Sequence, residues 1–129
     1  MCSATIGANV ALQGKTILVV EDDALIGILL TDFLSAGGAI VLGPVTNVSE
    51  ALECVKRRGF DIATIDVLLK DGVCFPVADK LIQLGIPFIF ITAYPDTEIK
   101  SSYLRLPKLL KPFKLQDLSD KIDFLLTKG

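Results

Sequence analysis

The segment Asp61-Ile62-Ala63-Thr64-Ile65-Asp66 decides how this chain of 129 residues is expected to fold. Its short apolar run, bounded by residues that favour turns, predicts a strand buried on both faces, as strands are in a parallel sheet. Asp66 stands at the carboxyl end of this strand, where open α/β sheets bind their ligands. The residue is therefore either a nucleophile or ligand, or a turn-forming aspartate that only ends the strand.

Strands and helices alternate along the rest of the chain. Gly37 and Gly38 end the first helix, because glycine tolerates the backbone that follows a helix. Asn47, with Glu50 three residues later, resembles a capping box at the start of the second helix. Strands are expected over 15–20, 39–43, 62–66, 88–91 and 108–110, and a short or mobile fourth helix over 95–106.

This alternation predicts a parallel sheet with right-handed crossovers. Five strand–helix units in a chain of this length fit an α/β fold, a doubly wound (βα)5 sheet with the flavodoxin-like order 2-1-3-4-5. In that order strands one and three are neighbours. The carboxyl ends of strands one, three, four and five then meet at one edge of the sheet.

Apolar spacing assigns an inward face to each helix. Pro76 must lie in the first turn of the third helix, expected over about 72–84, or the helix begins later. The inward faces are expected to comprise Leu25, Leu29 and Phe33 with Ile26 and Leu30 in the first helix, Val77, Ala78, Leu81 and Ile82 in the third, and Leu115, Leu118, Ile122, Leu125 and Leu126 in the last.

The composition favours one globular domain, since 51% of the residues are hydrophobic and 22% are charged. Residues 1–14 are small and polar without a clear period, so we expect a flexible leader there and a single domain over 15–129. The net charge of −2 and the lack of a basic stripe argue against nucleic acid as a partner. No apolar run approaches the roughly 18 residues of a membrane span, and residues 1–13 lack the regions of a secretory signal.

The residue types limit the chemistry. Cys2, Cys54 and Cys74 lie far apart, which indicates neither a zinc site nor a disulfide framework and suits a reducing cytosol. The chain contains no histidine, so a histidine base or metal ligand is excluded. Any chemistry has to rest on carboxylates, hydroxyls and lysines.

The predicted topology gathers five polar side chains around one crevice at the carboxyl edge of the sheet, namely Glu21, Asp22, Asp66, Thr92 and Lys111. Neighbouring carboxylates repel each other, and Mg²⁺ relieves that repulsion by taking oxygen ligands. A carboxylate can attack phosphorus, while lysine and threonine can hold phosphoryl oxygens. Taken singly, each residue has a simpler interpretation: the acids could mark the start of a helix, the threonine could end a strand, and the lysine could be a solvated surface residue. Their joint placement favours a site.

Four segments carry a resemblance to a known family. They are Ile-Leu-Val-Val-Glu-Asp-Asp (17–23), Asp-Ile-Ala-Thr-Ile-Asp-Val-Leu-Leu-Lys-Asp-Gly (61–72), Phe-Ile-Phe-Ile-Thr-Ala-Tyr (88–94) and Leu-Lys-Pro-Phe (110–113). With them the chain resembles a CheY-like receiver domain of the response regulators of bacterial two-component signalling. The similarity extends over about 14–126.

The resemblance implies a Mg²⁺ site and a phosphoacceptor. Asp66 matches the phosphoacceptor and a metal ligand, Asp22 a direct ligand, and Glu21 a ligand that reaches the ion through water. The backbone carbonyl of Leu68 matches the third protein ligand.

The same resemblance implies how the phosphoryl group is held and sensed. Thr92 matches the switch hydroxyl, Lys111 matches the phosphate-binding lysine, and the Lys111–Pro112 peptide matches one that is cis in the family. Lys108 stands where most receivers carry the aromatic switch, so the usual coupling cannot operate. Instead, 87–94 is similar to the Pro-Phe-x-Phe-Ala-Thr-Gly-Tyr signature of an alphaproteobacterial subgroup, often paired with histidine kinases of the HWE or HisKA2 type. Tyr94 is then either the replacement switch, together with 95–106, or a packing aromatic.

We therefore expect a stand-alone cytoplasmic receiver, a monomer or weak dimer. It would not be an enzyme, but would take a phosphoryl group from a sensor histidine kinase or histidine phosphotransfer protein and signal through protein contacts, without an output domain or a membrane anchor. One alternative is a CheY-like interaction module that works without phosphate. Another is a haloacid-dehalogenase-like phosphatase, which needs a second aspartate where this chain has Leu68.

Overall fold

The computed structural model describes residues 12–93 and 106–128. In chain order the elements are β1 (Thr16–Val20), α1 (Ala24–Ala36), β2 (Ile40–Val45), α2 (Val48–Arg57), β3 (Ile62–Ile65), β4 (Leu68–Leu69), β5 (Gly72–Val73), α3 (Phe75–Leu84), β6 (Phe88–Thr92), β7 (Lys108–Leu110) and α4 (Leu115–Lys128).

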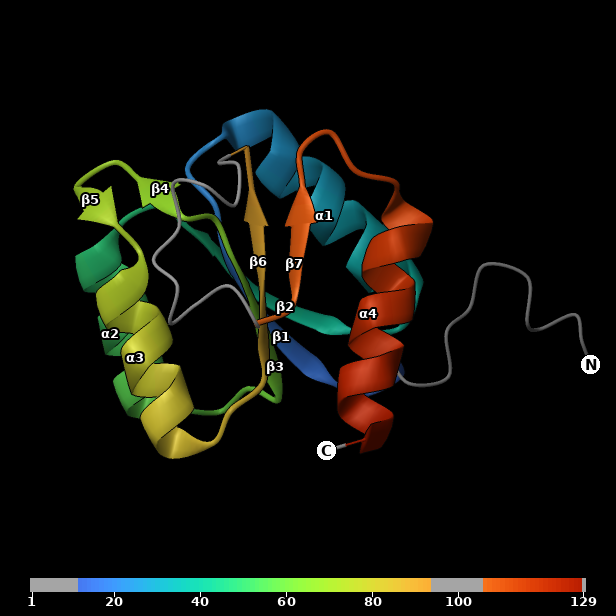
Figure 1. Cartoon of the computed structure of the whole chain (residues 1–129). Helices are drawn as coiled ribbons and strands as arrows, with labels where there is room; N and C mark the ends of the chain where they lie inside the picture. Colours follow the sequence, from blue (N-terminus) through green and yellow to red (C-terminus); the bar gives the residue numbers. More distant parts are fainter. Residues whose placement is uncertain (1–11, 94–105, 129) are drawn as a thin grey trace, which may run out of the picture.

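One parallel sheet with the order β2-β1-β3-β6-β7 runs through the domain (Figure 1). Since β6 and β7 are the fourth and fifth strands predicted, this confirms the order 2-1-3-4-5 and the α/β class. Tyr94 and residues 95–105 of the predicted fourth helix lie outside the described residues. No helix in the described ranges is long and apolar enough to cross a membrane.

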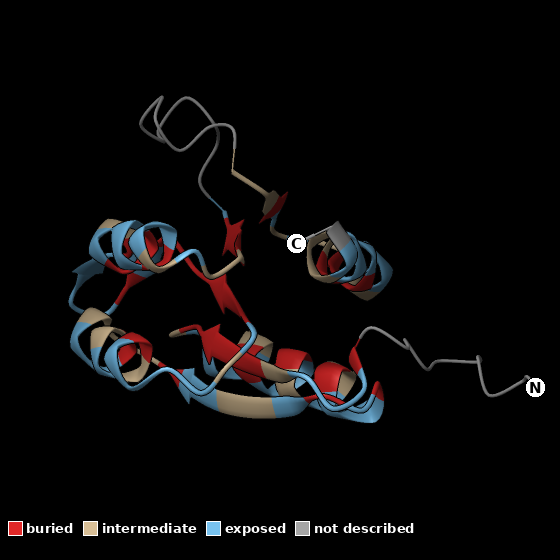
Figure 2. Ribbon diagram, turned by 90° about the horizontal axis from the view of Figure 1, so that it is seen from below, coloured by how far each residue is buried: buried red, intermediate tan, exposed pale blue. Residues whose placement is uncertain are grey.

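The sheet separates two apolar cores, and its central strands are buried on both faces (Figure 2). α2 and α3 cover one face, with Ala51, Val55 and Leu81 among the buried residues. α1 and α4 cover the other, with Leu30, Leu34 and Leu118. Leu12 also belongs to this second core and is only 1% exposed, although the sequence placed it in the leader. The division into leader and domain otherwise stays a prediction, because 1–11 are not described.

The register of the sheet aligns the carboxyl ends of neighbouring strands. Val20 pairs with Ile65 as β1 and β3 end together, and Thr92 pairs with Leu110 as β6 and β7 end together. The residue that follows each strand therefore emerges at the same edge. This places chain segments far apart in sequence within side-chain reach of one another.

The predicted inward face of α1 is right for Leu30, which is buried, and for Ile26 and Phe33, which pack against the core, but wrong for Leu25 and Leu29. Leu25 and Leu29 are 67% and 50% exposed, while the buried positions are Gly27, Leu30 and Leu34. Most of the helix is apolar, so its periodicity could not fix its rotation. The rotation of the helix is instead fixed by close packing. A Cβ on Gly27 would lie 2.9 Å from a ring carbon of Pro44, so the face of the helix that carries Gly27 packs against β2.

β2 continues past its predicted end at 43. Gly43 has a φ of +105°, and a Cβ there would lie 2.6 Å from the carbonyl oxygen of Val19 and 2.7 Å from the amide nitrogen of Val45. Only glycine fits this irregularity in the pairing with β1. The Gly43–Pro44 peptide is cis, and so is Lys111–Pro112, as the family resemblance implied.

The third helix begins at Phe75 rather than near 72, with Pro76 in its first turn. Val77, Ala78 and Leu81 are buried as predicted, but Ile82 is 50% exposed, so that assignment is wrong. Residues 68–73 form the antiparallel hairpin β4–β5, which was not predicted. Its two-residue loop contains Asp71 before Gly72, a pair that often marks hairpins.

Candidate functional site

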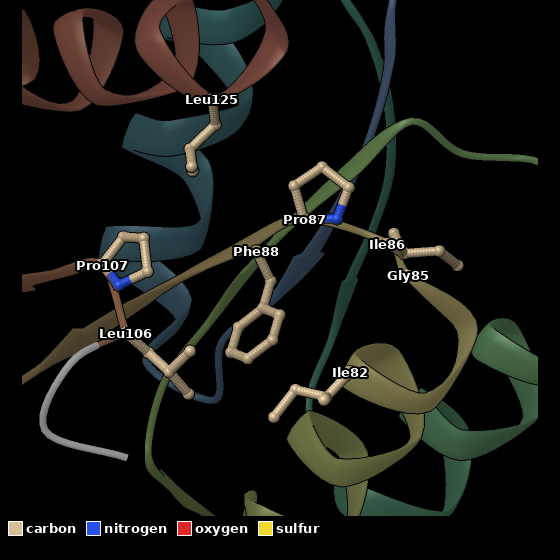
Figure 3. Close-up of a pocket in the computed structure, with 8 residues that line it drawn as sticks. All are labelled: Ile82, Gly85, Ile86, Pro87, Phe88, Leu106, Pro107 and Leu125. Carbon is tan, nitrogen blue, oxygen red and sulfur yellow. The ribbon is translucent and has the colours of Figure 1, made fainter. Parts of the chain in front are cut away.

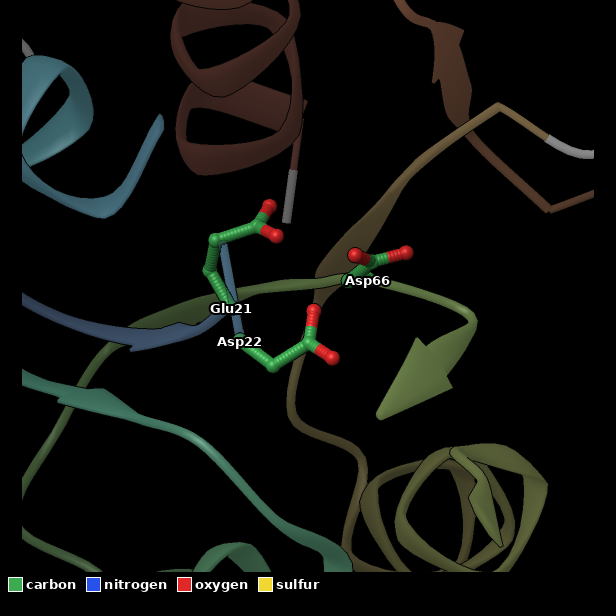
Figure 4. A group of neighbouring side chains, drawn as sticks. All are labelled: Glu21, Asp22 and Asp66. Atoms are coloured by element: carbon green, nitrogen blue, oxygen red, sulfur yellow. The ribbon is translucent and has the colours of Figure 1, made fainter. Parts of the chain in front are cut away.

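Three carboxylates converge at the carboxyl edge of the sheet. Glu21 and Asp22 follow β1 directly, and Asp66 follows β3. One carboxylate oxygen from each lies within 4.8 Å of the other two, and Figure 4 shows the three side chains turned toward a common space. The neighbouring ends of β1 and β3 produce this cluster, as the predicted strand order required.

Lys111 completes the cluster from the end of β7. Its Nζ donates to Oδ2 of Asp66 at 3.0 Å and to Oε2 of Glu21 at 3.1 Å. Burial disfavours the ammonium charge, but these two hydrogen bonds outweigh it and raise the pKa of Lys111. One cation therefore serves two acids, and the cluster as a whole keeps an excess of negative charge.

Glu21 is the most deeply placed acid, with 1% of its surface exposed. Its Oε2 also accepts from the Asp23 backbone N–H at 3.1 Å, whereas its Oε1 is buried without a hydrogen-bond partner among the described residues. Burial, followed by the nearby Asp66 carboxylate, raises the pKa of Glu21 from 4.5 to about 7. A buried oxygen in this state needs a proton or a cation.

Asp66 is held at both oxygens. Oδ1 accepts from the Leu68 backbone N–H at 3.3 Å, and Oδ2 is the oxygen bound by Lys111. The side chain is 9% exposed, so little of it is open to solvent. Its orientation depends on the chain just after β3 as well as on β7.

The remaining predicted residues have separate positions. Thr92 is the last residue of β6 and is fully buried at the same edge. Asp23, the third acid of the 21–23 run, lies outside the cluster: its Oδ1 accepts from Leu25 and Ile26 and caps α1. The plainer reading of the acidic run, a helix N-terminus, is therefore correct for Asp23. Tyr94 is outside the described residues.

The residues present fit a divalent cation. Mg²⁺ prefers oxygen ligands at about 2.1 Å, so neighbouring ligands around it lie about 3 Å apart. The three carboxylates already lie within 4.8 Å of one another, and Oε1 of Glu21 is a buried acceptor with no partner among the described residues. A bound cation would relieve both the like-charge repulsion and the desolvated oxygen.

Two apolar hollows differ in their distance from the site. One, of about 460 Å³, borders the site and is lined by Ile26, Leu29, Lys111, Pro112, Phe113 and Leu115. The other, of about 380 Å³, lies at the amino end of β6, away from the acids, and is lined by residues that include Ile82, Pro87 and Phe88 (Figure 3).

Fold and site together define a receiver-type signalling domain. Residues 17–123 match the response regulator receiver domain family, and the chain belongs to that family. Receiver domains bind Mg²⁺ at an acidic site, interact with histidine kinases or phosphotransfer proteins, and are generally signalling modules.

Individual relatives agree with this placement. The chain is 33% identical over 111 residues to the uncharacterized transcriptional regulatory protein YbdJ of Bacillus subtilis, and covers 48% of that protein with 83% of its own length. It is 37% identical to SdrG of Sphingomonas melonis Fr1 (TM-score 0.76, covering 91% of this chain and 98% of SdrG). A BeF3-activated conformation of SdrG gives 38% identity and a TM-score of 0.73, covering 86% and 95%.

A receiver domain of the Pseudomonas aeruginosa sensor kinase PA1611, with magnesium in its active-site cleft, shares the fold (TM-score 0.78, 21% identity, covering 88% and 98%). The chain thus spans about half the length of YbdJ but almost the whole of these two solved chains.

Proposed function

We propose that Asp66 accepts a phosphoryl group from a phosphohistidine and that the resulting aspartyl phosphate is the signal. The observation that carries this proposal is the pairing of Asp66 with Lys111 at 3.0 Å beside two further acids, one of which has a buried oxygen without a hydrogen-bond partner in the described part of the chain. The 129 residues contain no histidine, so the phosphohistidine must lie outside them.

In this proposal an Asp66 oxygen attacks phosphorus while the P–N bond to the donor imidazole breaks, and the imidazole leaves with a proton in place of the phosphoryl group. Lys111 supplies a positive charge that can pass from the Asp66 carboxylate to a phosphoryl oxygen. Thr92, at the end of the adjacent strand, donates its hydroxyl to a second phosphoryl oxygen.

Glu21, Asp22, Asp66 and the Leu68 carbonyl are the proposed Mg²⁺ ligands, Glu21 through water. When bound, Mg²⁺ supplies charge neutralisation for the acids and for the phosphoryl oxygens. The activated conformation of SdrG with BeF3 supports the proposal, because that group mimics a phosphoryl group and the two chains are 38% identical.

The surface beside Lys111 offers the donor protein a place to dock. The hollow of about 460 Å³ opens there, and Leu25, Ile28 and Leu29 of α1 are at least half exposed next to it. An apolar patch rimmed by the acidic site suits a helical donor that must bring its phosphohistidine to Asp66.

The finer assignments follow from the sequence. We propose that the chain is a member of the subgroup with the Pro-Phe-x-Phe-Ala-Thr-Gly-Tyr signature, that a kinase of the HWE or HisKA2 type is its donor, and that Tyr94 replaces the missing aromatic at 108. The added charge of the phosphoryl group would bias a local two-state element that a partner protein reads in the cytoplasm.

Phosphodonor labelling tests the proposal. With Mg²⁺ and acetyl phosphate the protein should gain the mass of one phosphoryl group, and Asp66→Asn should gain none. Glu53→Gln, a change to an acid on the exposed side of α2, serves as the matched control and should label normally. A wild-type protein that stays unlabelled by acetyl phosphate and by histidine kinases would favour the phosphate-independent module. Steady phosphate release from small phosphoesters would favour the phosphatase.

A further inference from the structure

A single exposed carboxylate joins the β4–β5 hairpin to α2. Asp71, in the loop of the hairpin, accepts from the Val48 backbone N–H at 2.6 Å through Oδ1. Its Oδ2 accepts from the Ser49 N–H at 3.4 Å and shares the single hydroxyl proton of Ser49, at 3.4 Å, with Asn47 Oδ1, which lies 3.2 Å from that hydroxyl. Beside it, the Lys70 N–H donates to the Thr46 carbonyl at 3.5 Å. The Asp71 contacts thus connect the hairpin loop to the first turn of α2, more than twenty residues earlier in the chain, and the Lys70 contact reaches Thr46, just before the cap of that helix.

α2 already has a cap of its own. The Asn47 side chain accepts from the Glu50 N–H at 2.8 Å, as the predicted capping box requires, but the Glu50 carboxylate accepts from the Asn47 side-chain amide at 3.2 Å, where a capping box would use the Asn47 backbone N–H. Asp71 therefore adds a long-range connection to a helix end that is locally capped. The hydrogen bond from Val48 lowers the pKa of Asp71, so the connection keeps its negative charge at neutral pH.

The other end of the hairpin is attached to the site. The Leu68 N–H donates to Oδ1 of Asp66, and the Cys74 N–H donates to the Val67 carbonyl at 2.7 Å and closes the segment. Val67 and Leu69 are buried, but Leu68 and Val73 are 46% and 41% exposed. The buried side chains anchor the base of the hairpin, whereas its exposed end is tied down by the Asp71 contacts.

We infer that Asp71 is a positioning residue: by fastening the hairpin to α2, it sets the backbone of Leu68 toward Asp66. The consequence reaches the metal site, because the Leu68 N–H orients Asp66 and the Leu68 carbonyl is a proposed ligand. This inference rests on the proposed function for its effect on Mg²⁺, but its effect on the Leu68 N–H does not depend on any ligand. Partners that orient metal ligands commonly change metal affinity by about 10- to 100-fold when removed.

The test compares Asp71→Ala with Asn47→Ala. Both remove a cap of α2, but only the first removes the side-chain connection to the hairpin; the backbone hydrogen bond from Lys70 to Thr46 is present in both variants. The Mg²⁺ dissociation constant, measured by NMR titration of each protein, should rise about tenfold in Asp71→Ala. In Asn47→Ala it should stay within about twofold of wild type, since the side-chain hydrogen bonds of Asn47 to described residues go to Ser49 and Glu50 of α2. Asp71→Asn, which keeps one acceptor oxygen, should lie between them and serves if the alanine variant does not fold.

A second readout needs no metal. Amide exchange of Leu68, followed in chelator, should accelerate in the Asp71 variants and remain unchanged in Asn47→Ala. If Leu68 amide exchange and Mg²⁺ affinity are the same in the Asp71 variants as in Asn47→Ala, the inference is overturned and Asp71 is only a second cap of α2. If the wild type binds no Mg²⁺ and accepts no phosphoryl group, the proposed function fails instead, and the exchange of Leu68 still decides whether Asp71 positions it.

Discussion

Replacing Glu21 with glutamine should make the metal-free protein more stable at alkaline pH. Burial, then the Asp66 carboxylate, raises the pKa of Glu21 from 4.5 to about 7. Because the pKa is higher in the folded state, protonation of Glu21 stabilises the fold. This contribution is complete below pH 4.5 and is lost as pH rises through about 7. Ionised Glu21 therefore destabilises the fold, and glutamine removes this penalty.

The size of the effect follows from the shift. Moving a pKa from 4.5 to about 7, at about 1.36 kcal/mol per unit, sets a ceiling of about 3 kcal/mol. Solvent reaches the neighbouring Asp22 and Lys111, which are only partly buried, and screens part of the interaction. We expect Glu21→Gln to exceed wild type by about 1–2 kcal/mol at pH 8 and to match it near pH 5.

Urea denaturation in chelator at pH 5 and pH 8 measures this difference. The chain has no histidine, so no histidine titration overlaps this range. Glu53→Gln, which alters an exposed acid paired with Arg57, should keep the pH dependence of wild type. Adding Mg²⁺ at pH 8 should stabilise the wild type more than Glu21→Gln. The reasoning is refuted if Glu21→Gln loses as much stability as wild type between the two pH values.

Four further changes test other parts of the structure. Lys111→Met should destabilise the metal-free protein by about 1–3 kcal/mol, because two acids lose their shared cation, and Mg²⁺ should recover part of that loss in urea titrations. Leu29→Arg should slow phosphotransfer from a kinase about tenfold or more, equivalent to about 1.4 kcal/mol, but leave labelling by acetyl phosphate unchanged; equal slowing with both donors would contradict docking at α1. Gly43→Ala should cost about 3 kcal/mol or more, since its Cβ has no space between two backbone atoms, and a thermal melt with little change would disprove this. Asp71→Asn should lose less stability than wild type below pH 3.8, because folding lowers the pKa of Asp71 and the stability that this provides disappears as pH falls through the lowered value. If urea titrations show the same loss of stability in acid for both proteins, the Val48 contact does not stabilise the fold.

The strand order and most of the candidate site could be predicted from the sequence. The apolar run before Asp66 and the alternation of strands with helices predicted one parallel sheet. In such a sheet the residues after β1, β3 and β7 must emerge together, and the structure places Glu21, Asp22, Asp66 and Lys111 accordingly.

Errors arose where local periodicity carried too little information. α1 is apolar on most of its surface, so Leu25 and Leu29 were predicted to be buried when the contact of Gly27 with Pro44 turns them outward. Ile82 follows the same period as its buried neighbours, but α3 exposes it at its last turn. For α1 the orientation depends on β2, a partner element that local sequence does not reveal.

The sequence by itself determined the class of fold and the kinds of atom at the carboxyl edge, because strand periodicity and residue type are local properties. Only the tertiary structure decided how those atoms are shared. It separates Asp23, which caps α1, from Glu21, which joins the cluster. It also places Lys111 between two acids and ties Asp71 to α2. These contacts join residues brought together by the packing of separate elements, and no local pattern encodes such distances.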